Sequence, residues 1–142
     1  MIYYGIDPDL EKCGVATYNP LTKKLDLALF TPEEIALGKP FDKHLQVTII
    51  IEAGWLNSGV YHVNHKMGYK TSAEVGRKVG LNHGIGTLIA RCLRDLGYKV
   101  QLVRPRNKKI GAKYFKTLSG KEEKNQEKID SAMLLYGFWK ND

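Results

Sequence analysis

Four acidic side chains stand at positions that suggest a shared chemical use. Asp7 directly follows the apolar run IYYGI, and Glu52 directly follows the β-branched run VTIII. Such runs are typical of buried strands, at whose ends a carboxylate loses hydration unless a partner compensates for it. Glu127 and Asp130 lie three residues apart near the C-terminus, so a helix there would carry both on one face.

Carboxylates that converge on one point need a counter-ion, because like charges repel. If the strands that end in Asp7 and Glu52 are parallel neighbours, their side chains meet at one edge of a sheet. A ligand set made only of oxygens favours a hard cation, Mg²⁺ or Mn²⁺. Two such ions about 4 Å apart would clamp a phosphodiester, activate a water and stabilise the leaving oxygen. The acids therefore predict metal-dependent phosphodiester hydrolysis.

Each acid also has an ordinary structural use, which the sequence leaves open. Asp7 precedes Pro8 and could cap a turn, whereas Glu52 could belong to a buried ion pair. Glu127 could be solvated on a lysine-rich helix, and Asp130, which the stretch SAMLLYGF follows, could likewise have a purely structural use. Only the partners that the fold supplies can decide between these uses and a metal site.

Positive charge is concentrated in the second half of the chain. Residues 1–71 carry 7 Lys or Arg against 8 Asp or Glu, whereas residues 72–142 carry 15 against 7. The densest stretch is RPRNKKIGAKYFKTLSGKEEK, and clustered bases of this kind favour a nucleic-acid partner over a merely solvated surface. The bases expected to contact phosphates are Arg77, Lys78, Arg104, Arg106, Lys108, Lys109, Lys113, Lys116 and Lys124.

Composition limits the other function classes. With 142 residues, 43% hydrophobic and 26% charged, the chain suits one folded domain. No apolar run is long enough to span a membrane, no signal peptide is evident, and a cytoplasmic location is expected. Cys13 and Cys92 form no CxxC pattern and are expected to be reduced thiols. His62 and His65 form an HxxH pattern, but no further zinc ligands at suitable spacing accompany it.

The segments that must position these acids predict an α/β fold. Three strands before the first long helix favour an antiparallel region, and two later strands separated by a helix favour parallel pairing. Helices are expected to pack on this mixed sheet. The five strands are expected at Ile2–Asp7, Gly14–Tyr18, Lys24–Phe30, Val47–Ile51 and, ended by Pro105, residues 98–104.

Helix-start signals occur at three places. The stretch TPEEIALG has a capping threonine, a proline at the first position and two acids in the first turn, which indicates a short helix. Thr71 with Glu74 and Ser119 with Glu122 have the spacing of capping boxes for a long helix and a final helix. Residues 53–70, before the long helix, are expected to form a long loop.

Glycines interrupt the long helix at four positions. They lower helix propensity, so we expect them to allow close packing against the sheet. They are Gly76, Gly80, Gly84 and Gly86, and Gly97 is expected to end the helix.

Four segments, taken in order, resemble a known family. YYGIDPDLEKCGVATY resembles the first hairpin of the RNase H-like superfamily and, more closely, that of the RuvC-type Holliday junction resolvases. VTIIIEAGW resembles their central strand with its catalytic Glu, EVGRKVGLNHGIGTLIARCLRDLGYKVQLVRP their long helix and next strand, and EKIDSAMLL the acidic start of their last helix. This resemblance implies a single RNase H-like nuclease domain over residues 1–142, with helices on both faces of a five-stranded mixed sheet.

For the site, the resemblance implies that all four acids are catalytic and bind metal. Asp7, Glu52, Glu127 and Asp130 would surround two Mg²⁺ ions, with Mn²⁺ as a substitute and Asp7 as the bridging ligand. The family often has Asp where Glu127 stands. Trp55 occupies the position of an aromatic that is thought to stack on a base at the opened crossover, and a tryptophan of the core is the alternative.

The implied activity is resolution of four-way DNA junctions by a homodimer. Each subunit would cut one of two strands of like polarity, leaving a 5′-phosphate and a 3′-hydroxyl. Lys108, Lys109 and Lys124 are candidates for a lysine that assists catalysis. The short connection before the last helix resembles phage or other mobile-element members more than the long bacterial type.

Three other functions are alternatives to a junction resolvase. Another RNase H-like nuclease, for example one that cuts RNA in hybrids, would use the same acids. A nucleic-acid-binding module without chemistry would use them structurally. An actin-like ATPase also begins with such a hairpin, but it needs two domains of this kind and the chain is too short.

Overall fold

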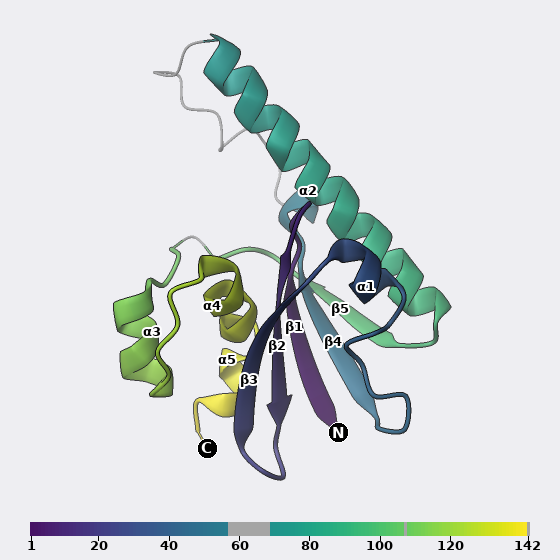
Figure 1. Cartoon of the computed structure of the whole chain (residues 1–142), viewed down its shortest axis with the longest axis vertical. Helices are drawn as coiled ribbons and strands as arrows, with labels where there is room; N and C mark the ends of the chain where they lie inside the picture. The colour runs from purple at the N-terminus through teal and green to yellow at the C-terminus, as the bar shows by residue number, and fades with distance from the viewer. Residues whose placement is uncertain (57–68, 107, 142) are drawn as a thin grey trace.

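The computed structural model describes residues 1–56, 69–106 and 108–141. Its centre is a five-stranded sheet in the order β3-β2-β1-β4-β5 (Figure 1). The first three strands pair antiparallel, and β1 pairs with β4, and β4 with β5, in parallel. The predicted mixed sheet is therefore confirmed. The strands are β1 (Ile2–Asp7), β2 (Cys13–Asn19), β3 (Lys24–Phe30), β4 (Val47–Glu52) and β5 (Lys99–Val103).

The central strand β4 is buried between two hydrophobic layers. Ile49 and Ile51 belong to the core on one face of the sheet, whereas Ile50 belongs to the core on the other. Side chains alternate along a strand, so a strand that is covered on both faces needs an unbroken apolar run. The run VTIII meets this requirement, and Glu52 is the first residue beyond it.

Helices α1 (Pro32–Ala36) and α2 (Tyr69–Asp95) cover one face. Thr31 caps α1 in a capping box with Glu34, as the sequence predicts. The C-terminal half of α2 packs on the sheet through Ile89 and Leu93. Its N-terminal half extends beyond the sheet (Figure 1).

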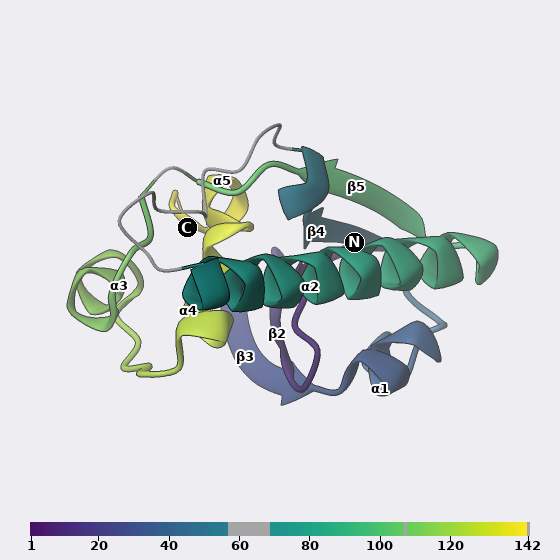
Figure 2. The same ribbon diagram turned by 90° about the horizontal axis from the view of Figure 1, so that it is seen from above.

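Three helices lie on the opposite face: α3 (Ala112–Ser119), α4 (Gln126–Met133) and α5 (Tyr136–Trp139). Ile129 of α4 and Trp139 of α5 are buried in the second core with strand residues of β2 and β3. The indole N–H of Trp139 donates to the carbonyl of Ala132 at 2.9 Å, which ties the two short helices together. The prediction of helices on both faces is confirmed (Figure 2).

Both predicted capping boxes in the second half of the chain are wrong. Thr71 lies inside α2, which begins at Tyr69, and Glu74 instead pairs with Arg77 at 2.8 Å. A threonine and a glutamate three residues apart also face each other within a helix, so their spacing alone does not locate its start.

Ser119 ends a helix rather than beginning one. Its hydroxyl donates to the carbonyl of Phe115 at 2.8 Å within the last turn of α3. The next helix begins at Gln126, after Asn125, whose side chain accepts from the N–H of Lys128 at 3.0 Å. The helix predicted to run from Ser119 to the C-terminal part of the chain is in fact a non-helical stretch, residues 120–125, followed by the separate helices α4 and α5.

The glycines of α2 do not all pack as expected. Among the described residues, nothing would lie within 4 Å of a β-carbon at Gly76, Gly80 or Gly84, so the expected close packing against the sheet is wrong at these positions. Of the four glycines, Gly86 alone has such neighbours within the described ranges, and they belong to Trp55 and Pro8 rather than to the sheet.

The predicted loop begins with a short 3-10 helix, η1 (Gly54–Leu56). The rest of it, including His62 and His65, lies largely outside the described residues. Cys13 and Cys92 are free thiols, and burial raises the pKa of Cys13 to about 12. None of the helices in the described ranges is long and apolar enough to cross a membrane.

Candidate active site

Asp7 and Glu52 end two neighbouring parallel strands at the same edge of the sheet. Ile6 of β1 pairs in register with Ile51 of β4, so the residues that follow them emerge side by side. Both carboxylates are half-buried. The parallel pairing that the sequence analysis required of these strands is therefore present.

Glycines in β1 and β2 let α4 approach the sheet closely. A β-carbon at Gly14 would overlap the carbonyl of Glu127, and one at Gly5 would overlap the carbonyl of Ser131. Gly14 is also the residue that pairs with Asp7 in the ladder. Because these atoms belong to the backbone, they cannot turn aside. The two glycines thus set the distance between the helix and the strand ends.

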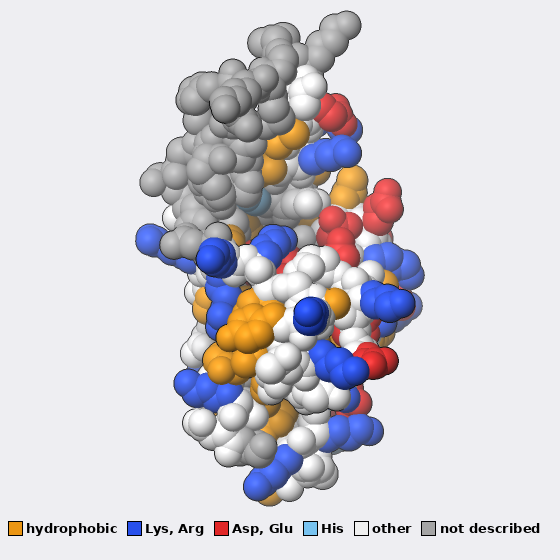
Figure 3. Space-filling model, turned by 90° about the vertical axis from the view of Figure 1, so that its left-hand side faces the viewer, with side chains coloured by type: hydrophobic (Ala, Val, Ile, Leu, Met, Phe, Trp, Pro, Cys, Tyr) orange, Lys and Arg blue, Asp and Glu red, His pale blue; other side chains and the backbone are white. Residues whose placement is uncertain are grey.

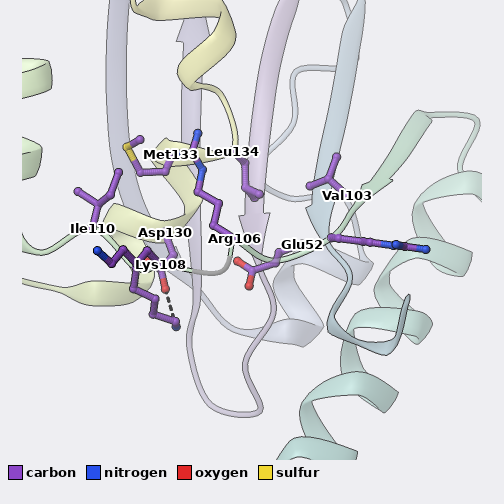
Figure 4. A pocket seen from close by; sticks show the side chains of 10 residues that line it. Glu52, Val103, Arg106, Lys108, Ile110, Asp130, Met133 and Leu134 are labelled. Carbon is purple, nitrogen blue, oxygen red and sulfur yellow. Dashed lines mark hydrogen bonds and ion pairs between the residues drawn. The ribbon is translucent and has the colours of Figure 1, made fainter. Parts of the chain in front are cut away.

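Asp130 is the most buried acid of the group, with 9% of its surface exposed. Its two oxygens accept from different donors, Lys109 Nζ at 2.9 Å and Gln126 Nε2 at 2.7 Å. Gln126 also donates to the carbonyl of Ile110 at 3.0 Å. These bonds join α4 to the basic segment after β5. Figure 4 shows that Asp130 and Glu52 line the same pocket.

The carboxylates affect one another electrostatically. Burial and the negative charges of Glu52, Asp130 and, less strongly, Glu127 raise the pKa of Asp7 to about 8. Burial and the charge of Asp130 also raise the pKa of Glu52. The four predicted acids therefore form one electrostatic group, assembled from β1, β4 and α4.

Lys109 supplies the opposing charge. Burial alone would lower its pKa, but the hydrogen bond to Asp130 and the charges of Asp130, Asp7 and Glu52 outweigh this and raise it. Its side chain is 68% exposed, so the ammonium enters the group from solvent. Of the three lysines considered as catalytic assistants, the structure brings Lys109 to the acids.

The donor chemistry suits a hard divalent cation, because the group offers only carboxylate oxygens. Within the described ranges, however, no three acidic, histidine or cysteine side chains are arranged so that they could hold a metal ion as they stand. Lys109 neutralises Asp130 in this arrangement. Metal binding would require the ammonium to leave Asp130 and the carboxylates to close together.

Trp55 is half-buried beside this group. It packs against the core under α2 and also lines a hollow of about 330 Å³ that contains Asp7 and Glu52. Asn82 and His83 of α2 line the same hollow. The ring of His83 lies 6.3 Å from that of Trp55, at an angle of 65°. Both uses considered for Trp55, core packing and exposure to a ligand, are thus compatible with its position.

A second hollow, of about 210 Å³, also has Glu52 in its wall (Figure 4). Its apolar walls include Met133 and Leu134, and four of the predicted DNA-contacting bases line it. These bases are Arg104, Arg106, Lys108 and Lys109. Arg106 also lies over the ring of Tyr136, 5.6 Å from its centre.

The remaining predicted DNA contacts are dispersed. Arg77 and Lys78 are exposed on the projecting half of α2, Lys113 and Lys116 on α3, and Lys124 before α4. Lys116 forms an ion pair with the exposed Glu122. On the face that carries α3, Lys and Arg side chains surround a hydrophobic area and are mixed with acids (Figure 3). The structure thus brings only some of the bases to the acidic group.

Sequence reasoning missed Gln126 and Gly14 as residues that organise the site. Gln126 precedes Asp130 by four residues, a spacing that predicts contact on a helix, and this signal was available. Gly14 gave no such signal, because its contact is with a helix more than a hundred residues away in the chain.

Comparisons with known proteins support the fold. No protein-family model and no curated protein matches the chain. Among solved structures, it is similar to T. thermophilus RuvC in complex with a Holliday junction substrate, with a TM-score of 0.56, 14% identity, and coverage of 99% of this chain and 95% of that one. This likeness shows the RuvC-like, RNase H-like fold.

A further solved structure, of Thermus thermophilus RuvC, has a TM-score of 0.38 and 16% identity over 98% of this chain and 80% of that one. A TM-score of 0.38 is too low to support a conclusion.

Proposed function

We propose that this chain is a structure-selective DNA endonuclease that resolves four-way junctions by two-metal-ion phosphodiester hydrolysis. The observation that carries the proposal is the group of four carboxylates at one sheet edge, in which neighbouring charges and burial raise the pKa of Asp7 to about 8. A RuvC structure of similar fold is a complex with a Holliday junction. The whole of residues 1–142 would be one RNase H-like nuclease domain.

Asp7, Glu52 and Asp130 would hold two Mg²⁺ ions, or Mn²⁺ in their place, with Glu127 as the fourth ligand. When bound, these ions would supply Lewis acidity and activate the attacking water. The protein would contribute the anchored positions of the carboxylates at the ends of β1 and β4 and on α4. Lys109, once released from Asp130, would face the phosphate and oppose its negative charge.

The basic side chains would hold the DNA backbone without reading its sequence. Arg104, Arg106 and Lys108 line the hollow next to Glu52 and would contact phosphates close to the cut. Trp55 would stack on an unpaired base in the hollow of about 330 Å³ that it lines together with Asp7. Arg77, Lys78, Lys113, Lys116 and Lys124 would contact more distant phosphates.

Two symmetric cuts in a four-way junction require two sites, so the active form would be a homodimer. Each cut would leave a 5′-phosphate and a 3′-hydroxyl. A cytoplasmic location and an origin in a phage or other mobile element stay predictions from the sequence.

A panel of four-way junction, duplex, RNA–DNA hybrid and flap substrates, each with Mg²⁺, tests the substrate class. We expect paired nicks in the junction and at least tenfold slower cutting of the others. Preferential cutting of the hybrid would contradict the resolvase assignment and favour the other RNase H-like nuclease.

The ion pair between Lys109 and Asp130 supports a second candidate, a DNA-binding module without chemistry. In that case the acids would be neutralised within the protein and would need no metal. Isothermal titration with Mg²⁺ distinguishes the two, because the binding module would show no uptake and no metal-dependent change in thermal stability.

A further inference from the structure

Trp55 rests on a place in α2 that only glycine provides. A β-carbon at Gly86 would lie 2.5 Å from Cζ3 and 3.0 Å from Cη2 of the Trp55 indole, and 3.1 Å from Cγ of Pro8. Real β-carbons essentially never approach other atoms within 3.0 Å. The outer ring of the indole therefore occupies the space that any side chain at this position would need.

A second contact between η1 and α2 has the reverse arrangement, with the glycine on η1 and the ring on α2. A β-carbon at Gly54 of η1 would lie 2.7 Å from Nε2 of His83 on α2. One glycine of α2 thus receives a ring from η1, and one glycine of η1 receives a ring from α2. Two complementary contacts of this kind fix both the distance and the register of the elements.

The other glycines of the helix show that this contact is specific. Within residues 1–56, 69–106 and 108–141, nothing lies within 4 Å of where a β-carbon at Gly76, Gly80 or Gly84 would stand. Glycine inside a helix lowers its stability relative to alanine. At Gly86 the lost helix stability is accompanied by a contact that only glycine allows, which is the close packing of the Trp55 indole into its seat on α2.

The seat lies next to the acidic group. Pro8, which shares it, follows Asp7 directly in the chain. Trp55 lines the hollow of about 330 Å³ together with Asp7 and Glu52. Because Trp55 is part of the wall of this hollow, an indole displaced from Gly86 would change the shape of the hollow.

We propose that Gly86 is a positioning residue, which seats the Trp55 indole against α2 and so keeps the hollow open for an unpaired nucleobase beside the acidic group. In naming a nucleobase as the occupant, this inference rests on the function proposed above. Gly86 acts through Trp55 and contacts neither the DNA nor the metal ligands.

A double-mutant cycle tests this coupling. The variants are Gly86→Ala, Trp55→Ala and the double variant, with Gly84→Ala as a matched control in the same helix. The probe is a four-way junction with 2-aminopurine at the crossover, titrated in Ca²⁺ to suppress cleavage. Stacking on an aromatic side chain is worth about 1–3 kcal/mol, or about 5- to 150-fold in Kd.

We expect Gly86→Ala to weaken binding about fivefold or more and to reduce 2-aminopurine quenching. In the Trp55→Ala background, the same substitution should change Kd less than twofold, because the indole is gone and only Pro8 Cγ, at 3.1 Å, remains close to the β-carbon. Gly84→Ala should resemble the wild type. An equal loss from Gly86→Ala in both backgrounds, or no loss in either, would overturn the proposal.

Acrylamide quenching gives a readout that needs no DNA. The chain has two tryptophans, so subtracting the signal of Trp55→Ala isolates Trp55. Its accessibility should rise in Gly86→Ala and stay constant in Gly84→Ala; constant accessibility in Gly86→Ala would refute the seat. If Gly86→Ala fails to fold, the pair Trp55→Phe and Trp55→Phe/Gly86→Ala replaces it in the binding measurements. The phenylalanine ring is shorter than the indole and leaves more room for a β-carbon at position 86.

If the wild type binds no junction, the proposed function fails. If Trp55 accessibility nevertheless rises in Gly86→Ala, the contact between Gly86 and Trp55 is supported, but the nucleobase is rejected as the occupant of the hollow.

Discussion

Replacing Asp7 with Asn should stabilise the metal-free protein while it abolishes the proposed cleavage. Asp7 has a pKa of about 8 in the folded chain, against 3.8 for an aspartate side chain free in water. Between these two pH values the folded state retains a proton that the unfolded state has released. Stability therefore falls as pH rises through this window, which is opposite to the behaviour of a carboxylate whose pKa is lowered by folding.

The size of this effect follows from the shift. Each pH unit inside the window changes the free energy of unfolding by about 1.4 kcal/mol, so the limit is about 6 kcal/mol near pH 8. Asp7 is only half-buried, and water reduces the effect. We therefore expect about 2–3 kcal/mol. For a chain of this length that corresponds to a rise in Tm of about 6–15 °C.

The assay is thermal unfolding in EDTA from pH 4 to pH 9, for the wild type and Asp7→Asn. The difference in Tm should be small near pH 4, where both side chains are neutral, and largest above pH 8. Mg²⁺ should then raise the Tm of the wild type and leave that of the variant nearly unchanged. A pH-independent difference, or a variant less stable than the wild type at pH 8, would refute the assembled carboxylate group.

Three other substitutions test separate parts of the account. Lys109→Met removes the counter-charge of Asp130 and should lower metal-free stability at pH 8 by about 1 kcal/mol, since the lysine is largely exposed; Mg²⁺ should restore part of it, as thermal melts would show. Gly14→Ala should displace α4, lower stability by about 1–3 kcal/mol and slow junction cleavage. Gly111→Ala should have none of these effects, because no described residue lies within 4 Å of its β-carbon position. Arg104→Ala should weaken junction binding and reduce the slope of log Kd against log salt by about 1, measured by fluorescence anisotropy.

The sequence was informative where one physical requirement dominates. The run VTIII had to be a strand covered on both faces, and Glu52 had to follow it. Ile49 and Ile51 do lie in one core and Ile50 in the other. The same reasoning located Asp7, and the mixed topology that brings the two strand ends together followed from the order of strands and helices.

The sequence was not informative where several residues satisfy one local rule equally well. Thr71 and Ser119 both fit the spacing of a capping box, but one lies inside a helix and the other ends one. Likewise Lys108, Lys109 and Lys124 were equivalent in a charge-rich segment. Only the path of the chain after β5 brings Lys109, 21 residues away in sequence, to Asp130.

Close contacts between distant segments were beyond sequence reasoning altogether. Four glycines in α2 have the same local effect on helix propensity. In the part of the chain that the structure describes, only Gly86 of these four has side chains within 4 Å of its β-carbon position, because η1 places Trp55 against it. Gly14 similarly has meaning only once α4 has been placed against the sheet.

The central claim is that four carboxylates from β1, β4 and α4 form a metal-dependent nuclease site. Its most direct measurement is the cleavage of a mobile four-way junction by the wild type and Asp7→Asn in Mg²⁺, with end-group mapping of the products. We predict paired nicks with 5′-phosphate and 3′-hydroxyl ends for the wild type, and junction binding without cleavage for the variant. No Mg²⁺-dependent cleavage by the wild type, or undiminished cleavage by Asp7→Asn, would contradict the account.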